Sequence, residues 1–277
     1  DRYHRQRLVD GFGDEGQCAL SNSCVAIVGV GALGCMSASF LARAGVGKII
    51  LIDRDIVELT NLQRQSLFTE EDAREQNPKA IAAKDHLQEI NSELEYISHV
   101  KDLHANNINH LLEGVDVIVD GLDNFQTRYL LNDFAVREGV PYMFAGVIAG
   151  MGNVMTILPQ DKTTPCLRCL FPDPPPASSQ ETCDTAGVLS PAIGIAASCQ
   201  TMDVLKFLTG NQDKISRTLL TFDLWNSQSN RLELGDPRED CSCCDHRNFE
   251  FLDDTKSPQP STLCGKTTVQ IPEIGRA

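Results

Sequence analysis

Residues 23 to 55 constrain the fold more than any other part of the chain. Two apolar runs rich in Val and Ile, 25–28 and 49–52, flank a segment of helical period, which is typical of buried parallel strands joined by a helix. Between them lie Gly29, Gly31 and Gly34, in the spacing that lets a chain turn sharply and bring bare backbone against a phosphate. The helix that follows points unpaired N–H groups at the same anion. The stretch therefore predicts a βαβ unit that binds a nucleotide.

Asp53 ends the second apolar run, 19 residues after Gly34, where a carboxylate would meet a ribose hydroxyl. The pattern does not name the nucleotide, because nicotinamide-dependent oxidoreductases share it and a tight turn without a ligand also matches. An oxidoreductase of that kind is therefore one candidate. It needs an acid or base facing the hydride, and no His or Lys–Tyr pair in the sequence stands out for that role.

Composition excludes several classes of function. The 277 residues suffice for one large α/β domain or two small ones. With 24 basic and 38 acidic side chains, the net charge of -14 argues against a nucleic-acid or anionic-membrane partner. No apolar run reaches the length of a membrane span, and the first residues have no secretory pattern. We expect a cytoplasmic protein, and since the first residue is not Met, an upstream piece is expected to be missing.

The rest of the chain predicts a doubly wound, Rossmann-like α/β fold with a mostly parallel sheet extended by antiparallel strands. Further strands are predicted at 115–119, 141–147, 153–158, 218–223 and 231–234. A helix from Lys79 to Asn91, with Ile81, Leu87 and Ile90 at helical spacing, and one ending at Gly139 cover the sheet. A long helix is predicted from Ser190, taken as its cap, to 208.

Four of the eleven cysteines form two CxxC pairs, Cys166 with Cys169 and Cys241 with Cys244. Two such pairs predict a closed, structural zinc site that staples the C-terminal part of the fold, and the clustering suits a reduced compartment. Four unrelated buried thiols are the alternative. Cys243 would be a free neighbour of the site.

Three other cysteines have less specific surroundings. Cys183 lies in a proline-rich loop, where it is either an exposed nucleophile or a thiol without a catalytic role. Cys35 and Cys199 fall within predicted helices and are expected to be small core residues.

A set of polar residues is predicted at the carboxyl edge of the sheet. Asp123 follows a strand there and can hold Mg²⁺ beside a polyphosphate, although a helix cap at the Asp–Asn pair is equally natural. Asn61, Arg64 and Lys79 lie in loops that return to this edge, and each alone is more often a solvated side chain. Together with Arg5 they would surround a triphosphate with positive charge, which nucleotidyl transfer requires and a dehydrogenase does not.

Nine short motifs occur in an order that resembles the ubiquitin-activating superfamily, especially its bacterial sulfur-carrier adenylyltransferases. In chain order they are RYHRQ, GVGALG, DRD, NLQRQ, NPK, GLDN, CLRC, TCDTAG and CSCC. The resemblance covers the chain to about Cys244. It implies a homodimer that uses MgATP to adenylate the C-terminal Gly-Gly of a small ubiquitin-fold carrier, with release of pyrophosphate. The carrier's pathway, molybdopterin, thiamine or another thiolation, stays open.

The resemblance also implies roles for individual residues. Asp53 would hold the ribose above the loop of Gly29, Gly31 and Gly34, Asp123 would organise Mg²⁺, and Cys183 would form a covalent link to the carrier in some members. The residues implied to bind and polarise the phosphates are Asn61, Arg64, Lys79 and, from the neighbouring subunit, Arg5.

We accordingly expect an adenylation domain over 1–248. Residues 249–277 are then an extension or the start of a further domain such as a sulfurtransferase. The competing hypotheses are the oxidoreductase and a non-catalytic, zinc-stapled scaffold that binds a ubiquitin-fold partner.

Overall fold

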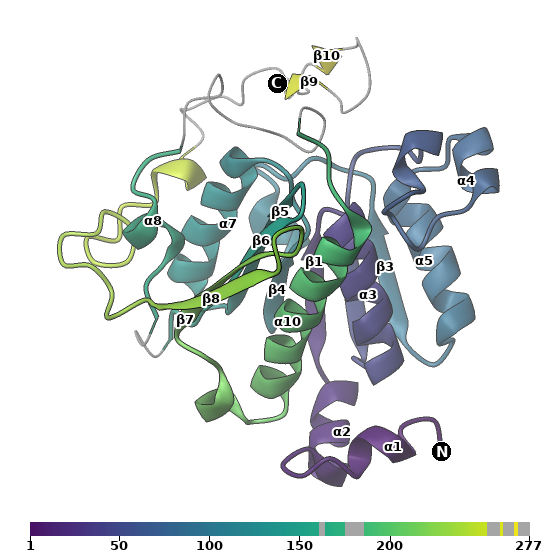
Figure 1. The fold of residues 1–277 in the computed structure, drawn as a ribbon, viewed down its shortest axis with the longest axis horizontal. Coiled ribbons are helices and arrows are strands. Elements are labelled where there is room, and N and C mark those ends of the chain that lie inside the picture. Colours follow the sequence, from purple (N-terminus) through teal and green to yellow (C-terminus); the bar gives the residue numbers. More distant parts are fainter. Residues whose placement is uncertain (161–163, 175–185, 254–260, 263–268, 271–277) are drawn as a thin grey trace.

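An eight-stranded sheet forms the centre of the structure, a computed structural model that describes residues 1–160, 164–174, 186–253, 261–262 and 269–270 (Figure 1). The strand order is β3-β2-β1-β4-β5-β6-β7-β8, with β1 to β5 parallel and β6 to β8 added antiparallel. The strands are β1 (Cys24–Val28), β2 (Lys48–Ile52), β3 (Glu95–His99), β4 (Val117–Asp120), β5 (Tyr142–Ile148), β6 (Met151–Ile157), β7 (Thr218–Asp223) and β8 (Gln228–Glu233). The predicted fold class is confirmed.

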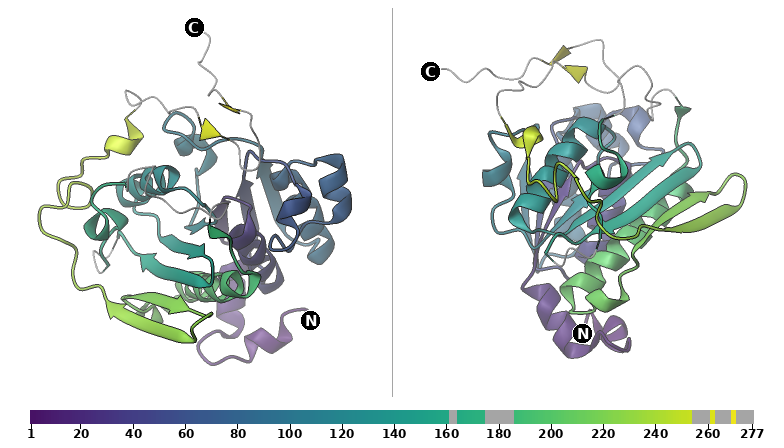
Figure 2. Two further views of the ribbon diagram at one scale, coloured as in Figure 1. Left: turned by 45° about the horizontal axis from the view of Figure 1, so that its top comes forward. Right: turned by 90° about the vertical axis from the view of Figure 1, so that its left-hand side faces the viewer.

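Helices cover both faces of the sheet, and the β7–β8 hairpin extends it beyond β6 (Figure 2). One face carries α2 (Gly13–Ser21), α3 (Ala32–Ala44), α5 (Lys79–Ile90) and α10 (Ser190–Leu208). The other carries α6 (Ile108–Leu111), α7 (Phe125–Glu138) and α8 (Leu167–Leu170). The shorter elements are α1 (His4–Arg7), η1 (Leu59–Asn61), α4 (Glu70–Glu75), η3 (Gln212–Lys214), η4 (Glu250–Leu252), β9 (Ser261–Thr262) and β10 (Val269–Gln270).

The unbroken apolar runs of the central strands follow from this layering. In β1, Val25 and Ile27 pack into the core under α3 and α5, whereas Ala26 and Val28 pack into the core under α7. Successive side chains of a strand point to opposite faces, so a strand covered on both faces needs apolar residues throughout. Burial on both faces holds the carboxyl ends of these strands in fixed positions.

Local signals account for several helix boundaries. The side chain of Asn124 accepts a hydrogen bond from the backbone N–H of Thr127 and so caps α7, as the Asp–Asn alternative predicted. Gly139 ends the same helix with a φ of 74°. Ser190 was predicted to cap α10, and this was wrong: it is the first helical residue, Leu189 is the cap residue, and no side chain caps the helix.

The sequence missed β3. Two of its five residues, Tyr96 and Ile97, are apolar and only Tyr96 is buried, because β3 is an edge strand that pairs with β2 alone. Ile81 was predicted to face the core from α5 but is 41% exposed, since Ala80, Ala83 and Leu87 form the buried face instead.

Among the remaining expectations, Cys35 is fully buried as predicted, whereas Cys199 is only partly buried. Of the described residues, none forms a helix that is both long and apolar enough to cross a membrane.

Candidate functional site

A cleft of about 1080 Å³ opens at the carboxyl ends of the parallel strands. It lies where the strand order reverses between β1 and β4, which is where ligands bind in open α/β sheets. Seven residues singled out in the sequence line it together: Gly29, Gly31, Asp53, Asn61, Arg64, Lys79 and Asp123. The structure therefore brings these predicted site residues together from four separate loops.

The glycine loop closes against the loop that follows β4. Gly29 has a φ of 87°, and a Cβ on it would lie 2.6 Å from the carbonyl oxygen of Gly121. A Cβ on Gly34 would lie 2.0 Å from the carbonyl oxygen of Gly29, so Gly34 allows the helix to start close to the loop. Gly34 does not itself line the cleft. Gly31 does, and a Cβ there would meet nothing closer than 3.8 Å.

Asp53 is held at the end of β2 by two backbone donors. The N–H of Val30 donates to its Oδ2 at 2.7 Å, and the N–H of Asp55 donates to its Oδ1 at 2.8 Å. Burial raises the pKa of Asp53 to about 6, although Lys79 and these donors act in the opposite direction. The carboxylate is thus charged at neutral pH and aimed at the loop.

Lys79 is a buried cation in the same cleft, with 6% of its surface exposed. Its Nζ lies 3.2 Å from Oδ2 of Asp55. Burial opposes the charge, but Asp53, Asp55 and Asp123 outweigh it and raise the pKa of Lys79. The ammonium group is therefore a permanent positive charge that faces the site.

Arg64 and Asn61 reach the cleft from the segment that begins with η1. Asn61 is buried, and its Oδ1 accepts a hydrogen bond from the N–H of Glu58 at 3.0 Å, which fixes the start of the segment. Arg64 is partly buried, and its Nη1 donates to the carbonyl oxygen of Thr60 at 2.9 Å. The guanidinium group is thus held beside the cleft by its own turn.

Asp123 is exposed and lies directly before the cap of α7, where its charge acts on both Lys79 and Arg128. Sequence analysis did not single out Arg128. It is 6% exposed, lines the cleft, and donates to Oδ2 of Asp120 at 3.0 Å and to the carbonyl oxygen of Leu122 at 2.6 Å. Arg128 therefore holds the loop that carries Asp123. Because Arg128 lies three residues inside a helix, nothing in the local sequence indicated that its side chain is buried.

The far half of the cleft has different chemistry. Gly146, Asn153, Thr221 and Asn230 are direct partners across β5, β6, β7 and β8, and all four line the cleft. This row contains no charged side chain. Sequence analysis missed it, since it exists only once the antiparallel strands are in register.

Arg5, a predicted site residue, does not lie at this cleft. Arg5 lies in α1, and the neighbouring Gln6 donates to the carbonyl oxygen of Ala44, the last residue of α3. Because α3 starts at the glycine loop and has 13 residues, Arg5 lies about 20 Å away at the opposite end of the sheet (Figure 1). Cys183 lies outside the described residues.

The four predicted zinc ligands converge on the other side of the molecule. Cys166 Sγ lies 3.8 Å from Cys169 Sγ and 3.7 Å from Cys241 Sγ, and the sulfurs of Cys169 and Cys244 are 3.4 Å apart. Four sulfurs about 2.3 Å from a tetrahedral zinc ion are about 3.8 Å from one another, so the arrangement fits the metal. Cys243 lies beside the cluster, and Asn132 Nδ2 donates to its sulfur at 3.3 Å.

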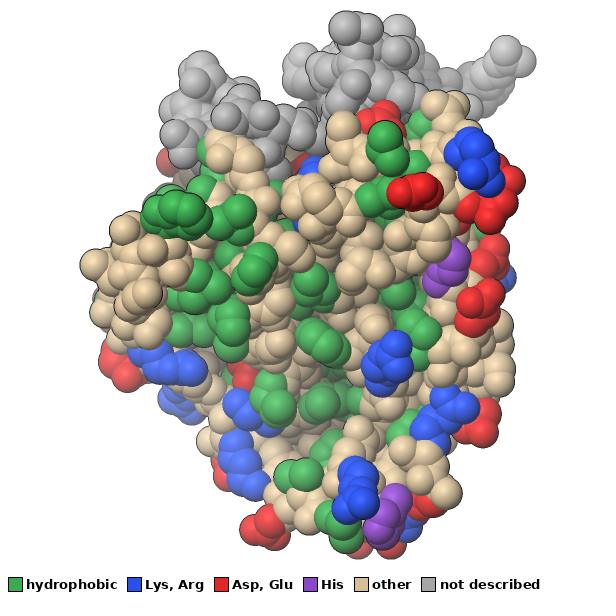
Figure 3. All heavy atoms as spheres, turned by 45° about the vertical axis from the view of Figure 1, so that its right-hand side comes forward, with side chains coloured by type: hydrophobic (Ala, Val, Ile, Leu, Met, Phe, Trp, Pro, Cys, Tyr) green, Lys and Arg blue, Asp and Glu red, His purple; other side chains and the backbone are tan. Residues whose placement is uncertain are grey.

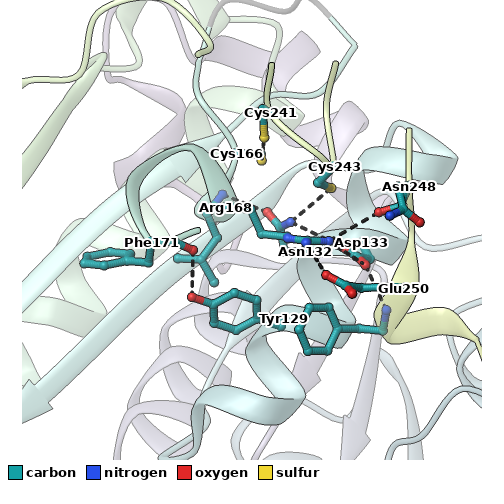
Figure 4. Close-up of polar contacts among 12 residues, drawn as sticks. Tyr129, Asn132, Asp133, Cys166, Arg168, Phe171, Cys241, Cys243, Asn248 and Glu250 are labelled. Carbon is teal, nitrogen blue, oxygen red and sulfur yellow. Dashed lines mark hydrogen bonds and ion pairs between the residues drawn. The ribbon is translucent and has the colours of Figure 1, made fainter. Parts of the chain in front are cut away.

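A buried polar network joins this cluster to α7 (Figure 4). The backbone N–H of Leu167 donates to Asn132 Oδ1 at 2.8 Å, and Arg168 forms ion pairs with Asp133 and Glu250. The N–H of Phe251 donates to Asp133 Oδ2 at 3.1 Å. Residues 249–253 are therefore docked on α7.

Fold and site together define a Rossmann-like protein with a charged cleft at the carboxyl ends of its parallel strands and a four-cysteine cluster. The profile of the ThiF family matches residues 3–243, and the chain belongs to that family. It is 41% identical over 271 residues to the sulfur carrier protein ThiS adenylyltransferase of Bacillus subtilis, covering 98% of this chain and 79% of that protein. It is 40% identical over 243 residues to the adenylyltransferase and sulfurtransferase MOCS3 of Culex quinquefasciatus, covering 88% of this chain and 55% of that protein.

Solved structures agree with these matches. E. coli MccB bound to AMPCPP and the peptide MccA has a TM-score of 0.75 and 25% identity, over 88% of this chain and 74% of that one. MccB with a succinimide has a TM-score of 0.76 at the same identity and coverage. The chain spans about half the length of the MOCS3 relative. The predicted membership of the sulfur-carrier adenylyltransferase group, an enzyme class that uses ATP, is confirmed.

Proposed function

We propose that this chain uses MgATP to adenylate the C-terminal glycine of a small ubiquitin-fold sulfur-carrier protein, releasing pyrophosphate, for sulfur transfer in thiamine or molybdopterin synthesis. One observation carries the proposal: a single cleft combines a glycine loop, Asp53 and buried cationic groups in one half with an uncharged row in the other. The two named sequence relatives are adenylyltransferases, one of the sulfur carrier protein ThiS and one combined with a sulfurtransferase.

The charged half suits attack of a carboxylate on the α-phosphorus of ATP. This reaction brings two anions together, so the site must neutralise charge and align the attacking oxygen, and no base is required at neutral pH. Lys79 and Arg64 supply fixed positive charge, Asn61 supports their segment, and Asp53 orients the ribose. Asp123 offers the exposed carboxylate that Mg²⁺ prefers, and the bound ion would neutralise further phosphate charge.

The uncharged row of Gly146, Asn153, Thr221 and Asn230 suits the end of a carrier chain. The row contains a bare glycine, Gly146, followed by the uncharged side chains of Asn153, Thr221 and Asn230. Amide and hydroxyl groups of this kind can hydrogen-bond to peptide backbone without demanding a side chain. A tail that ends in Gly-Gly therefore fits, since it offers backbone and nothing else.

We further propose that the enzyme is a homodimer in which Arg5 completes the site of the partner subunit. Arg5 is exposed, makes no ion pair within the described part of the chain, and lies too far from its own cleft. Hydrophobic side chains are spread over the face that α3 and α10 cover (Figure 3), where Phe40, Ile195 and Met202 are each more than 40% exposed. A face of this kind is typical of an interface.

The zinc cluster, the domain boundary and the compartment complete the proposal. Zinc at Cys166, Cys169, Cys241 and Cys244 would staple the adenylation domain, 1–248, while 249–277 form an extension or the start of a further domain that begins docked on α7. Free thiols throughout the described residues favour the reduced cytoplasm. We propose that Cys183→Ala leaves adenylation intact, because the transfer of AMP needs no thiol.

ATP–pyrophosphate exchange with Mg²⁺ and a panel of Gly-Gly-ending carriers tests the function. Exchange with one carrier would identify the pathway, and Arg64→Ala or Asp123→Asn should abolish it. Arg74→Ala is the matched control, because Arg74 is an exposed arginine that contacts only Glu71 through an i,i+3 pair. Carrier binding without exchange would instead support the scaffold, and preference for NAD over ATP would support the oxidoreductase. Exchange that survives in both site variants would refute our assignment.

A further inference from the structure

Gln65 is a buried polar residue that the proposed reaction does not yet use. It directly follows Arg64, is 4% exposed, and lines the cleft. Its Oε1 is buried and has no hydrogen-bond partner among the described residues. Buried side-chain amides are nearly always paired, so an unpaired oxygen on a residue that lines a cleft indicates that a partner is supplied from outside.

The position of Gln65 is fixed by its surroundings. Its backbone N–H donates to the carbonyl oxygen of Asn61 at 2.9 Å, and its carbonyl oxygen accepts from the N–H of Phe68 at 3.2 Å. Leu67 and Phe68, which follow it closely, are both buried in the core. The backbone that carries the Gln65 amide is therefore anchored on both sides.

The amide of Gln65 faces Gly31 in the glycine loop. Its Nε2 lies 3.8 Å from the position that a Cβ on Gly31 would occupy. The preceding residue, Val30, donates its N–H to Asp53, the carboxylate placed to meet a ribose. Gln65 and Asp53 thus lie beside neighbouring residues of one loop, at the N-terminus of the 13-residue helix α3. In the proposed adenylation, a nucleotide bound at this loop would have its ribose and its first phosphate between these two side chains.

We propose that Gln65 is a nucleotide-positioning residue that binds the junction between the ribose and the α-phosphate. An amide offers an N–H donor and a carbonyl acceptor, and this junction offers a phosphate acceptor and hydroxyl donors. The nucleotide then satisfies the oxygen that the protein leaves unpaired. The same contact holds the α-phosphorus still for attack. The inference rests on the proposed adenylation, but it concerns binding and is measured without a carrier.

The test compares Gln65→Met with Gln63→Met by calorimetric titration of AMP and of ATP. Methionine keeps the length and unbranched shape of glutamine but cannot form the hydrogen bonds. Gln63 is the matched control, since it belongs to the same segment and is exposed. Gln65→Met should weaken AMP and ATP about equally, by about 10- to 100-fold. Gln63→Met should leave both affinities unchanged.

Thermal melting without nucleotide supplies a second readout. Removing an unpaired buried oxygen should raise the melting temperature of Gln65→Met by about 2–4 °C, so that affinity falls while stability rises. A residue with a merely structural role would show the opposite, a lower melting temperature. Unchanged AMP affinity in Gln65→Met, or a loss confined to ATP, would overturn the proposal.

Gln65→Glu separates the phosphate contact from the ribose contact. A carboxylate beside the α-phosphate should weaken AMP far more than adenosine, and equal weakening of the two would contradict the phosphate contact. These measurements distinguish a failure of the adenylation proposal from a failure of the inference about Gln65. If wild-type protein binds AMP, Gln65→Met does not, and no carrier supports exchange, then the positioning role stands and the reaction is wrong.

Discussion

Replacing Arg168 by methionine should destabilise the protein strongly without altering the nucleotide cleft. Arg168 is 3% exposed, its Nη1 lies 3.5 Å from Asp133 Oδ2, and it also pairs with Glu250 (Figure 4). Its guanidinium carbon lies 5.2 Å from the centre of the Phe251 ring. Methionine keeps most of the packed stem but leaves Asp133, which is fully buried, without its cation.

The expected loss follows from these contacts. Removing one partner of a buried ion pair costs about 3–5 kcal/mol, because the other charge remains buried. Arg168 Nε is itself buried without a hydrogen-bond partner among the described residues, so its removal offsets about 1 kcal/mol of this loss. We therefore expect the free energy of unfolding to fall by about 2–4 kcal/mol. Burial already raises the pKa of Asp133, so the deficit should shrink as the pH falls and Asp133 takes up a proton.

Urea denaturation of samples with equal zinc content measures this loss. Arg74→Met is the control, because Arg74 and Glu71 form an exposed pair whose loss should cost less than about 0.5 kcal/mol. The double variant Asp133→Asn, Arg168→Met should recover part of the stability, since neither charge is then buried. A single Arg168→Met variant within about 1 kcal/mol of wild type would refute the reasoning about the buried charge.

Three further predictions concern the cleft and the cluster. Gly34→Ala should prevent stable folding, because the added Cβ would lie 2.0 Å from the carbonyl oxygen of Gly29. Gly31→Ala should fold but bind ATP more weakly. Circular dichroism measures the folding of the two variants, and calorimetry measures their ATP affinity. The pKa of Asp53 is raised to about 6, so its contribution to stability is fully present below pH 4 and is lost as the pH rises through 6. The free energy of unfolding of the wild type, minus that of Asp53→Asn, should therefore rise by about 2 kcal/mol when the pH is lowered from 7 to 4. A difference that does not change with pH would contradict the raised pKa of Asp53. Chelation of zinc should lower the melting temperature and release one metal ion per chain. The Cys166→Ser variant should release no metal, because it binds none. A protein that melts at the same temperature with and without chelator would contradict the structural zinc site.

Most of the fold could be predicted because its central strands are buried on both faces. Runs such as 25–28 and 49–52 carry that information locally, and so do Gly139 at the end of α7 and the two CxxC pairs. The sequences of the edge strands carry less of this information. β3 has one neighbour and β8 is exposed along its length, so the residues in them had no reason to be apolar.

The candidate site divides in the same way. Asp53, Lys79 and Asp123 were found because charged residues next to strand ends or glycine loops stand out in a sequence. Arg128 and Gln65 were missed as site residues, because an arginine inside a helix and a glutamine in a polar stretch look solvated until packing buries them.

By itself, the sequence determined the nucleotide loop, the cysteine pairs and the family motifs, because each is a short pattern whose chemistry depends on near neighbours. Only the tertiary structure decided which residues meet. It placed Gly146, Asn153, Thr221 and Asn230 in one row and Arg5 at the far end of α3. It also buried the oxygen of Gln65, a residue of the cleft, without a partner among the described residues. These relations depend on strand register, helix length and desolvation, which arise only when distant segments pack together.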